Sequence, residues 1–335
     1  MAAIHLLVWD NQRGLSHDLR LFHEALLAQG HQVRVTRLGP RWKDGRWRAV
    51  GQRLQLWWRW AISLGRSPRR YDVNIALETV RPRFFTLARR NVIVPHPEWF
   101  PPVSQRFIDR YDAVLTKTFV GTAIFTPIAR KVLQTGFTSC DRFDPAVEKH
   151  PDFLHVAGAS TMKGTARLLD VWQRHPEWPM LTVVQSPQTV DPANAVIAPN
   201  IRHRIEYVAD EELRTLQNSH AFHLCLSETE GWGHYLVEAM GCGAVVITCD
   251  APPMNELVSP ERGMLVAASP VGQCQLATLY AFDAPDLERV ITQAAAMPSD
   301  QWKRLGDNAR AWFLKVQGTF PARLGQAIDQ LLRED

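Results

Sequence analysis

The sequence predicts an α/β protein built from two successive parallel-sheet domains. Short apolar runs alternate with amphipathic stretches, which is the pattern of strand–helix–strand units with right-handed crossovers. The alternation restarts after the polar stretch 139–152, and a chain of 335 residues suits about two domains. Hydrophobic residues make up 46% and charged residues 21%, which excludes wholesale disorder and collagen-like repeats.

In the first half, six apolar runs predict strands around one clear helix. The helical pattern runs from Ser16 to Gln29, with Leu19, Phe22 and Leu26 on one face and Gly30 as its stop. The expected strands are Ile4–Trp9, Gln32–Leu38, Val73–Leu77, Val92–Pro95, Ala113–Thr116 and Val132–Gly136.

The second half repeats the alternation and ends in helices from Pro285 to Asp335. The expected strands are Phe153–Ala157, Leu181–Gln185, Phe222–Leu226, Val245–Cys249 and Met264–Ala267. The helices expected between them are Thr165–Arg174, Asp210–Asn218 and His234–Gly241.

The cysteines and the N-terminal residues indicate the cellular compartment in which the protein is expected. The five cysteines form no Cys-x-x-Cys pair and no histidine cluster has zinc-ligand spacing, so buried thiols in a reducing compartment are expected. The N-terminal MAAIHLLVWD has neither a basic leader nor a small-residue cleavage site, so it predicts a first strand rather than a signal peptide. No apolar run approaches the ~18 residues of a membrane-spanning helix. These features favour a cytoplasmic protein.

A basic, tryptophan-rich segment lies in the first half. Residues 39–71 hold nine Lys or Arg against one acid, and five of the twelve tryptophans. Interfacial tryptophans and arginines on anionic head groups would make this segment a peripheral contact with an anionic membrane. A core helix with solvated arginines would have the same composition. Phosphate contacts with aromatic stacking would also suit nucleic acid, but nucleic acid is not the expected partner.

The stretch with the most specific chemistry is Ser227–Cys242, SETEGWGHYLVEAMGC. Glu230 lies in a turn flanked by two glycines after a predicted buried strand, and Glu238 follows eight positions later on the next predicted helix. Glycines let backbone N–H groups approach a ligand closely, and a helix N-terminus suits phosphate. The Glu238 carboxylate could accept from two ribose hydroxyls, with His234 on the same helix face. In isolation, both glutamates could equally be solvated turn residues.

This motif resembles the signature of family 4 retaining glycosyltransferases, which have the GT-B fold. The family carries two glutamates separated by seven residues, a glycine turn and a phosphate-binding lysine. The match covers about residues 153–260, and the first half is similar in pattern only. The matching motifs are Ser227-x-x-Glu230-Gly231-Trp232-Gly233 followed by Glu238-Ala239-Met240, and His155-Val156-Ala157-Gly158 followed by Lys163-Gly164.

The resemblance implies two Rossmann-like domains that face each other across a cleft. It implies an acceptor-binding domain over 1–146, a nucleotide-sugar-binding domain over 147–298, and C-terminal helices over 299–335 that cross back to the first domain. In such a protein Lys163 would bind the diphosphate, Glu238 the ribose, and Glu230 the transferred sugar as a catalytic residue. The other donor-site residues that it implies are Gly158, Ser160, Gly231, Trp232, Gly233 and His234.

Two departures from the family pattern matter. The family has an arginine directly after the glycine that matches Gly158, and this chain has alanine, so Ser160 or Arg167 would have to replace that contact to phosphate. The family also often has a glycine pair near Gly14, where this chain has one glycine. The matched region carries no acidic metal-binding motif such as Asp-x-Asp. Lys163 and the helix N-termini are therefore expected to stabilise the leaving diphosphate without a metal or other cofactor.

The acceptor side is expected in the first domain. His96 follows a predicted strand, and members of the family often carry a functional histidine on that side, so it is the second catalytic candidate. A structural histidine in a proline-rich turn would have the same sequence context. Gly14, Asp10 and Glu98 are further candidates for the acceptor side.

The resemblance implies a retaining, metal-independent transferase for a hexose-like sugar. It would move a sugar from a nucleotide-sugar donor to a saccharide or lipid-linked saccharide acceptor in cell-surface polysaccharide synthesis, at the inner face of the membrane. A front-face displacement is the mechanistic hypothesis, with the leaving phosphate accepting the proton of the acceptor. Three alternatives stay open: a nucleotide-sugar epimerase, a sugar phosphorylase, and a non-catalytic protein that binds anionic polymers through residues 39–71.

Overall fold

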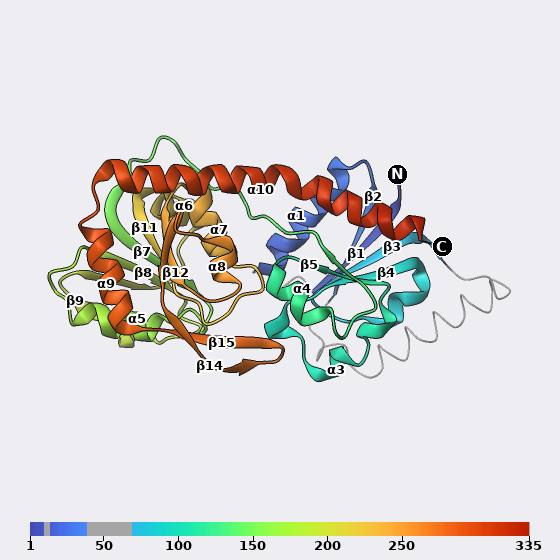
Figure 1. The fold of residues 1–335 in the computed structure, drawn as a ribbon, viewed down its shortest axis with the longest axis horizontal. Helices are drawn as coiled ribbons and strands as arrows, with labels where there is room; N and C mark the ends of the chain where they lie inside the picture. The colour runs from blue at the N-terminus through green and yellow to red at the C-terminus, as the bar shows by residue number, and fades with distance from the viewer. Residues whose placement is uncertain (10–13, 39–68, 335) are drawn as a thin grey trace. The chain divides into compact units, whose positions relative to one another are not determined.

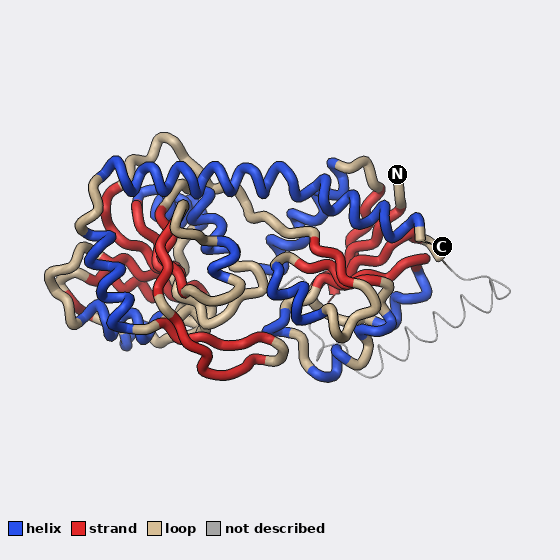
Figure 2. Tube along the Cα trace, in the orientation of Figure 1, coloured by secondary structure: helices blue, strands red, loops and turns tan. Residues whose placement is uncertain are grey.

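Each half of the chain folds around its own parallel sheet with helices packed against it (Figures 1 and 2). The computed structural model describes residues 1–9, 14–38 and 69–334. The N-terminal unit comprises Met1–Phe137 and Gly318–Asp335, and the C-terminal unit comprises Thr138–Gln317. The predicted class, two Rossmann-like α/β domains, is confirmed.

The N-terminal unit contains a six-stranded parallel sheet of order β2-β1-β3-β4-β5-β6. Helix α1 (Gly14–Ala28) connects β1 to β2 and buries one apolar face that includes Leu19, Phe22 and Leu26, as its periodicity predicts. The strands are β1 (Ala3–Trp9), β2 (Gln32–Leu38), β3 (Tyr71–Leu77), β4 (Ala88–Val94), β5 (Ala113–Thr116) and β6 (Val132–Gln134). The shorter helices are η1 (Pro82–Leu87), η2 (Pro97–Trp99), α3 (Pro102–Gln105), η3 (Ile108–Arg110) and α4 (Phe119–Phe125).

The C-terminal unit contains a seven-stranded sheet of order β13-β12-β11-β7-β8-β10-β9, parallel except at the edge strand β9. Its strands are β7 (His150–Gly158), β8 (Leu181–Gln185), β9 (Ile197–Ala198), β10 (Ile201–Ile205), β11 (His220–Cys225), β12 (Val245–Cys249) and β13 (Gly263–Val266). Its helices include η4 (Pro192–Asn194), α5 (Thr165–Gln173), α6 (Asp210–Ser219), α7 (His234–Gly241), α8 (Met254–Leu257) and α9 (Ala284–Ala295).

A two-stranded hairpin, β14 (Ala268–Cys274) and β15 (Ala277–Phe282), follows the sheet of the C-terminal unit. It was not predicted from the sequence. Most residues of β14 are exposed, so the strand lacks the apolar alternation that marks a half-buried strand. Hydrogen bonds to β15 hold it instead.

Helix α10 (Ser299–Arg333) is one continuous helix of 35 residues, and its last part, from Gly318, belongs to the N-terminal unit. Phe320 packs there on Phe22 and Phe137 with ring centroids 5.5 and 5.0 Å apart, and all three side chains are buried. Such aromatic packing is a strong anchor for a helix end. Among the described residues, no helix combines the length and the apolar character needed to cross a bilayer.

The boundary between the units lies between Phe137 and Thr138, so the predicted boundary at residue 146 is displaced. The polar stretch after Phe137 is tied to helix α6 of the C-terminal unit. The Arg142 guanidinium donates to the Gln217 side chain and, at 2.9 Å, to the Asp210 carboxylate. The Asp144 N–H donates to Asn218. These contacts are long-range in sequence, so the polar composition of the stretch did not reveal them.

His155 on β7 ties three elements of the C-terminal unit together. Its Nδ1–H donates to the Leu224 carbonyl on β11 at 2.8 Å, and its Nε2 lies 2.9 Å from the Thr165 hydroxyl at the start of α5. A neutral imidazole has one donor and one acceptor nitrogen, which this environment satisfies. Burial lowers the pKa of His155 from 6.5 to about 4.

The neutral state of His155 predicts a pH-dependent stability. The unfolded chain takes up a proton at His155 below pH 6.5 and the folded chain only near pH 4, so stability falls as the pH falls through this window. The expected contribution to the slope is about 1.4 kcal/mol per pH unit. His155→Gln supplies a neutral amide in place of the imidazole and should reduce the slope by that amount in urea unfolding between these pH values. Parallel slopes for wild type and variant would contradict this.

Candidate active site

The site in the C-terminal unit follows from the order of its strands. From the central strand β7, the chain builds β8 and β10 on one side, and then β11, β12 and β13 on the other. The loops that follow β7 and β11 therefore leave neighbouring strands at the point where the strand order reverses. Open α/β sheets bind ligands at the carboxyl ends of strands at such a point. Lys163 follows β7 and Glu230 follows β11.

The loop between β7 and α5 is shaped by two glycines with positive φ. Gly158 has a φ of +55° and Gly164 a φ of +68°. A Cβ on Gly164 would lie 2.6 Å from the carbonyl oxygen of Leu226, so only glycine lets this loop approach the end of β11 so closely. Within the loop, the Ser160 hydroxyl accepts from the Met162 N–H at 3.2 Å. This close approach places Lys163 beside the motif turn.

The Lys163 ammonium and the Glu230 carboxylate form an ion pair, and each side chain is 14% exposed. The Ser227 hydroxyl donates to the same carboxylate oxygen at 2.6 Å. Two residues that the sequence assigned to the donor site are thus in direct contact, although they are 67 positions apart. Partial burial makes the attraction between these two charges stronger than it would be in bulk water.

Tyr235 completes a closed group of four residues. The Lys163 Nζ lies 3.6 Å from the centre of the Tyr235 ring, and the Tyr235 hydroxyl lies 2.5 Å from the Ser227 Oγ. We call Lys163, Ser227, Glu230 and Tyr235 the donor quartet. Ser227 belongs to the motif, but no role for Ser227 or Tyr235 was predicted from the sequence. Their positions directly after a strand and in the first turn of a helix were the available signals.

Two helices begin at this site with glycine N-caps. Gly164 precedes α5 and Gly233 precedes α7, both in the left-handed conformation. Because glycine has no side chain, neither N-cap residue supplies an oxygen to the first N–H groups of its helix. Those N–H groups and the positive end of the helix dipole suit an anionic ligand.

The structure assigns packing contacts to two of the predicted donor-site residues. Trp232 is buried and its indole N–H donates to the Ser139 hydroxyl oxygen at 3.1 Å. The Nδ1 of His234 lies 2.8 Å from the same oxygen. Gly231, between Glu230 and Trp232, is buried as well. These contacts hold the motif turn against the segment that opens the C-terminal unit.

Glu238 is buried in the second turn of α7, in a separate hydrogen-bond network. The Gln217 amide donates to the Glu238 carboxylate at 3.4 Å, and the Gln217 carbonyl accepts from Arg142. Arg142 and Gln217 therefore orient Glu238. Neither residue was predicted from the sequence, because both lie in segments outside the motif.

The hairpin also touches the site. The Tyr280 N–H on β15 donates to the Glu228 carbonyl at 2.8 Å, and the Phe282 ring lies 3.3 Å from the position of a Cβ on Gly164. The guanidinium of Arg167, in the first turn of α5, lies 4.8 Å from the centre of the Phe282 ring. Arg167 is thus held near the start of α5, where the sequence analysis considered it as a contact to phosphate.

The acceptor-side candidate His96 belongs to a charged cluster in the N-terminal unit. Its Nδ1 lies 3.1 Å from the Glu78 carboxylate, and its Nε2 lies 2.7 Å from the Lys117 Nζ and 3.3 Å from the Asp18 carboxylate. Lys117 also donates to Asp18 at 2.6 Å. These residues come from α1 and from the carboxyl ends of β3, β4 and β5. Glu78 has a φ of +61°, a strained backbone that an ordinary residue rarely adopts.

The charges around His96 act in opposite directions. Burial and the nearby Lys117 ammonium lower the pKa of His96, but the carboxylates of Asp18 and Glu78 outweigh them and raise it to about 9. The Lys117 Nζ lies 2.7 Å from the His96 Nε2, and both nitrogens lie beside the Asp18 carboxylate. His96 is therefore held in a cluster of charged groups of both signs rather than as an isolated imidazole.

The other acceptor-side candidates are less informative. Gly14 is exposed at the start of α1, and Glu98 is buried in η2. Asp10 and residues 39–68 of the basic, tryptophan-rich segment lie outside the described residues.

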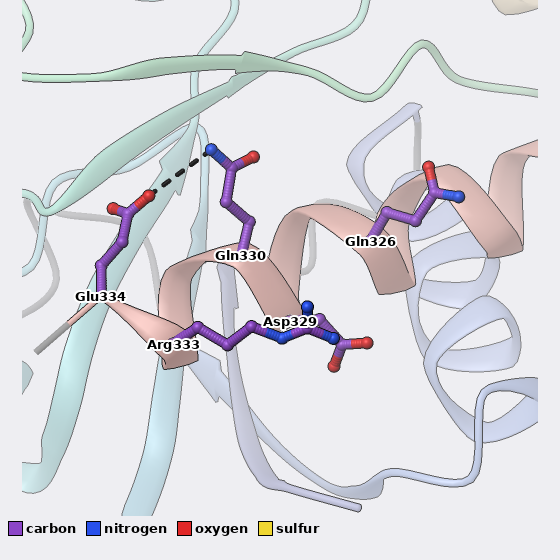
Figure 3. Close-up of a pocket in the computed structure, with 5 residues that line it drawn as sticks. All are labelled: Gln326, Asp329, Gln330, Arg333 and Glu334. Atoms are coloured by element: carbon purple, nitrogen blue, oxygen red, sulfur yellow. Dashed lines mark hydrogen bonds between the residues drawn. The ribbon is translucent and has the colours of Figure 1, made fainter.

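A depression of about 280 Å³ lies on the C-terminal part of α10 (Figure 3). The Gln330 amide on its rim donates to the Glu334 carboxylate at 3.4 Å. The depression is lined by Gln326, Asp329, Gln330, Arg333 and Glu334, and none of the predicted site residues lines it.

Comparisons with known proteins found one matching family and several similar structures. Residues 140–296 match the family described as Glycosyl transferases group 1. A stretch of 102 residues is 33% identical to the GDP-mannose:cellobiosyl-diphosphopolyprenol alpha-mannosyltransferase of Xanthomonas oryzae pv. oryzae (strain PXO99A). That stretch covers 29% of this chain and 27% of the relative, so the matched region spans about a quarter of the relative's length.

Three solved structures share the fold over nearly the whole chain. Sucrose-phosphate synthase from Thermosynechococcus elongatus has a TM-score of 0.72 at 16% identity, covering 100% of both chains. A glycosyltransferase from Rickettsia africae ESF-5 has a TM-score of 0.69 at 12% identity, covering 99% of both. Anabaena HepE in complex with UDP-glucose has a TM-score of 0.63 at 17% identity, covering 99% of both. Residues 140–296 are therefore similar to group 1 glycosyl transferases, and the chain shares the GT-B fold with these solved structures.

Proposed function

We propose that the protein is a retaining glycosyltransferase that uses a nucleoside-diphosphate sugar as its donor. The single observation that carries the proposal is the contact between Lys163 and Glu230 at the switch point of the C-terminal sheet. A cation, a carboxylate and two helix N-termini meet there, which suits a ligand with a diphosphate next to a sugar. The diphosphate needs the positive groups, and the sugar hydroxyls need an acceptor oxygen.

In this proposal each group of the donor has its own residues. Lys163 and the N–H groups at the start of α5 and α7 bind the diphosphate, with the Ser160 hydroxyl and Arg167 near the same loop. Glu230 accepts from hydroxyls of the transferred sugar, and Glu238 from the ribose. The buried contacts of Gln217 with Glu238 support a fixed orientation of that carboxylate.

The proposed acceptor is a saccharide or a lipid-linked saccharide of a cell-surface polysaccharide, used at the inner face of the membrane. The name of the Xanthomonas relative, which acts on a polyprenol-linked saccharide, supports the lipid-linked class. We propose residues 39–71 as the contact with anionic lipid, and liposome sedimentation with and without anionic lipid tests this. Equal partitioning of the protein into both kinds of liposome would contradict a contact with anionic lipid.

The proposed chemistry is a front-face displacement. The bond between the anomeric carbon and the diphosphate oxygen breaks, the acceptor oxygen bonds to the same face, and its proton goes to the leaving diphosphate. Lys163 and the helix N-termini stabilise the charge that develops on the diphosphate, which is the work a metal ion does in other transferases. We propose His96 as a catalytic residue of the N-terminal unit, where it lies beside Lys117, Asp18 and Glu78.

The stereochemical test uses the product. NMR of the anomeric proton should show the donor's configuration in the new linkage, and EDTA should leave the rate unchanged after removal of free metal. An inverted linkage would contradict the retaining mechanism. A rate that EDTA abolishes and Mg²⁺ restores would contradict the role of Lys163 as the cation for the leaving group.

Lys163→Met should weaken nucleoside-diphosphate binding. A charge-assisted hydrogen bond contributes about 1.5–3 kcal/mol, which corresponds to a loss of affinity of roughly 10- to 100-fold. Thermal-shift screening against UDP, GDP, ADP, TDP and CMP identifies the base, and calorimetry with the best ligand gives the affinity. Lys303→Met, an exposed lysine on α10, is the matched control and should bind like the wild type. Equal affinities of the two variants would contradict the phosphate role.

His96→Ala should lower the rate of transfer without changing nucleotide affinity, because His96 belongs to the N-terminal unit and Lys163 to the C-terminal unit. General acid–base groups contribute roughly 100-fold or more to a rate, and a loss of this order is expected in kcat. Steady-state kinetics and calorimetry on the same preparation separate the two effects. A weaker nucleotide affinity with an unchanged kcat would argue against a catalytic role.

A further inference from the structure

The donor quartet poses a chemical problem for the proposed function. Lys163 is expected to bind a diphosphate and Glu230 a sugar, yet each charge is neutralised by the other. A diphosphate beside Lys163 would also lie close to the Glu230 carboxylate, and like charges at one cation repel each other. Donor binding therefore requires one negative group to replace the other.

Tyr235 has the contacts to hold the lysine during such a replacement. Its ring lies 3.6 Å from the Lys163 Nζ, which is cation–π geometry, and an aromatic face carries no net charge that a phosphate would repel. An ammonium group has three N–H donors, so it can keep its position over the ring while its anionic partner changes. Tyr235 is the second residue of α7, two positions after the Gly233 N-cap, and is thus positioned by a helix rather than by a loop.

The hydroxyl groups of the quartet form a directed chain. Ser227 has a single hydroxyl proton and donates it to Glu230, so its oxygen accepts from the Tyr235 hydroxyl. Burial raises the pKa of Tyr235 well above its ordinary value, which keeps that proton in place. One residue therefore reaches both charges: Lys163 through its ring, and Glu230 through Ser227.

We infer that Tyr235 is a positioning residue that holds Lys163 while its anionic partner changes from Glu230 to the donor diphosphate. In the free protein the Glu230 carboxylate binds the Lys163 ammonium group. When the diphosphate binds the ammonium group instead, the carboxylate becomes available to the sugar hydroxyls. Occupation of the phosphate site thus creates the sugar site. This inference rests on the proposed function, because it assumes a diphosphate donor.

The inference predicts opposite effects of two substitutions on the affinity for a nucleoside diphosphate that carries no sugar. Glu230→Gln removes the competing charge, so UDP or GDP should bind roughly tenfold more tightly, although sugar transfer should fall. Tyr235→Leu removes the aromatic face, so the same ligand should bind roughly tenfold more weakly. Tyr235→Phe keeps the face and loses only the hydroxyl, so affinity should stay near that of the wild type while kcat falls.

Calorimetry with the full chain and both UDP and GDP tests these three variants, with Glu261→Gln as the exposed control for the loss of a carboxylate. Glu230→Gln retains the size of the side chain, so the sign of its effect stays measurable even if Tyr235→Leu does not fold. If Glu230→Gln binds UDP and GDP no more tightly than the wild type does, the proposed exchange of Glu230 for the diphosphate is overturned. Tyr235→Phe binding as weakly as Tyr235→Leu would overturn the role of the ring. A wild type that binds neither these two ligands nor ADP or TDP in the same assay would instead refute the proposed function, and the inference with it.

Discussion

The ion pair between Lys163 and Glu230 is the contact on which the candidate site depends. It exists because the strand order of the C-terminal sheet brings the ends of β7 and β11 side by side, and because Gly164 lets one loop pass within contact distance of the Leu226 carbonyl. His155 on β7 links β11 and the start of α5 as a neutral group, with both ring nitrogens hydrogen-bonded. The buried His155 and the loop between β7 and α5 thus both help to place the Lys163 ammonium group.

The two units handle charge differently. In the C-terminal unit, the charged pair is partly exposed and lies beside glycine-capped helices, so a charged ligand can compete for it. In the N-terminal unit, Asp18 and Lys117 are almost fully buried and share their hydrogen bonds with His96. Such a cluster holds the imidazole in place between two carboxylates and an ammonium group. This contrast supports a donor in the C-terminal unit and a role for His96 that concerns protons or orientation.

Much of the fold could be predicted from hydrophobic runs. β2, β5, β8 and β12 have the predicted bounds: β5, β8 and β12 are short, mainly apolar runs, and β2 intersperses apolar residues with polar ones. β14 could not be predicted because it is mostly exposed. The bounds of the units could not be predicted either, because hydrogen bonds to distant residues on α6 place the polar stretch after Phe137. The motif identified Lys163 and Glu230 through a resemblance. Roles for Tyr235, Lys117 and Asp18 were not predicted, because these roles come from contacts that only the folded topology creates.

A crystal structure of the full chain with an intact nucleoside-diphosphate sugar would test this exchange of partners most directly. We expect the Lys163 Nζ to lie within hydrogen-bond distance of a diphosphate oxygen, still over the Tyr235 ring, and the Glu230 carboxylate to have turned to a hydroxyl of the sugar. A donor bound elsewhere, or a bound donor with the ion pair between Lys163 and Glu230 intact, would contradict it.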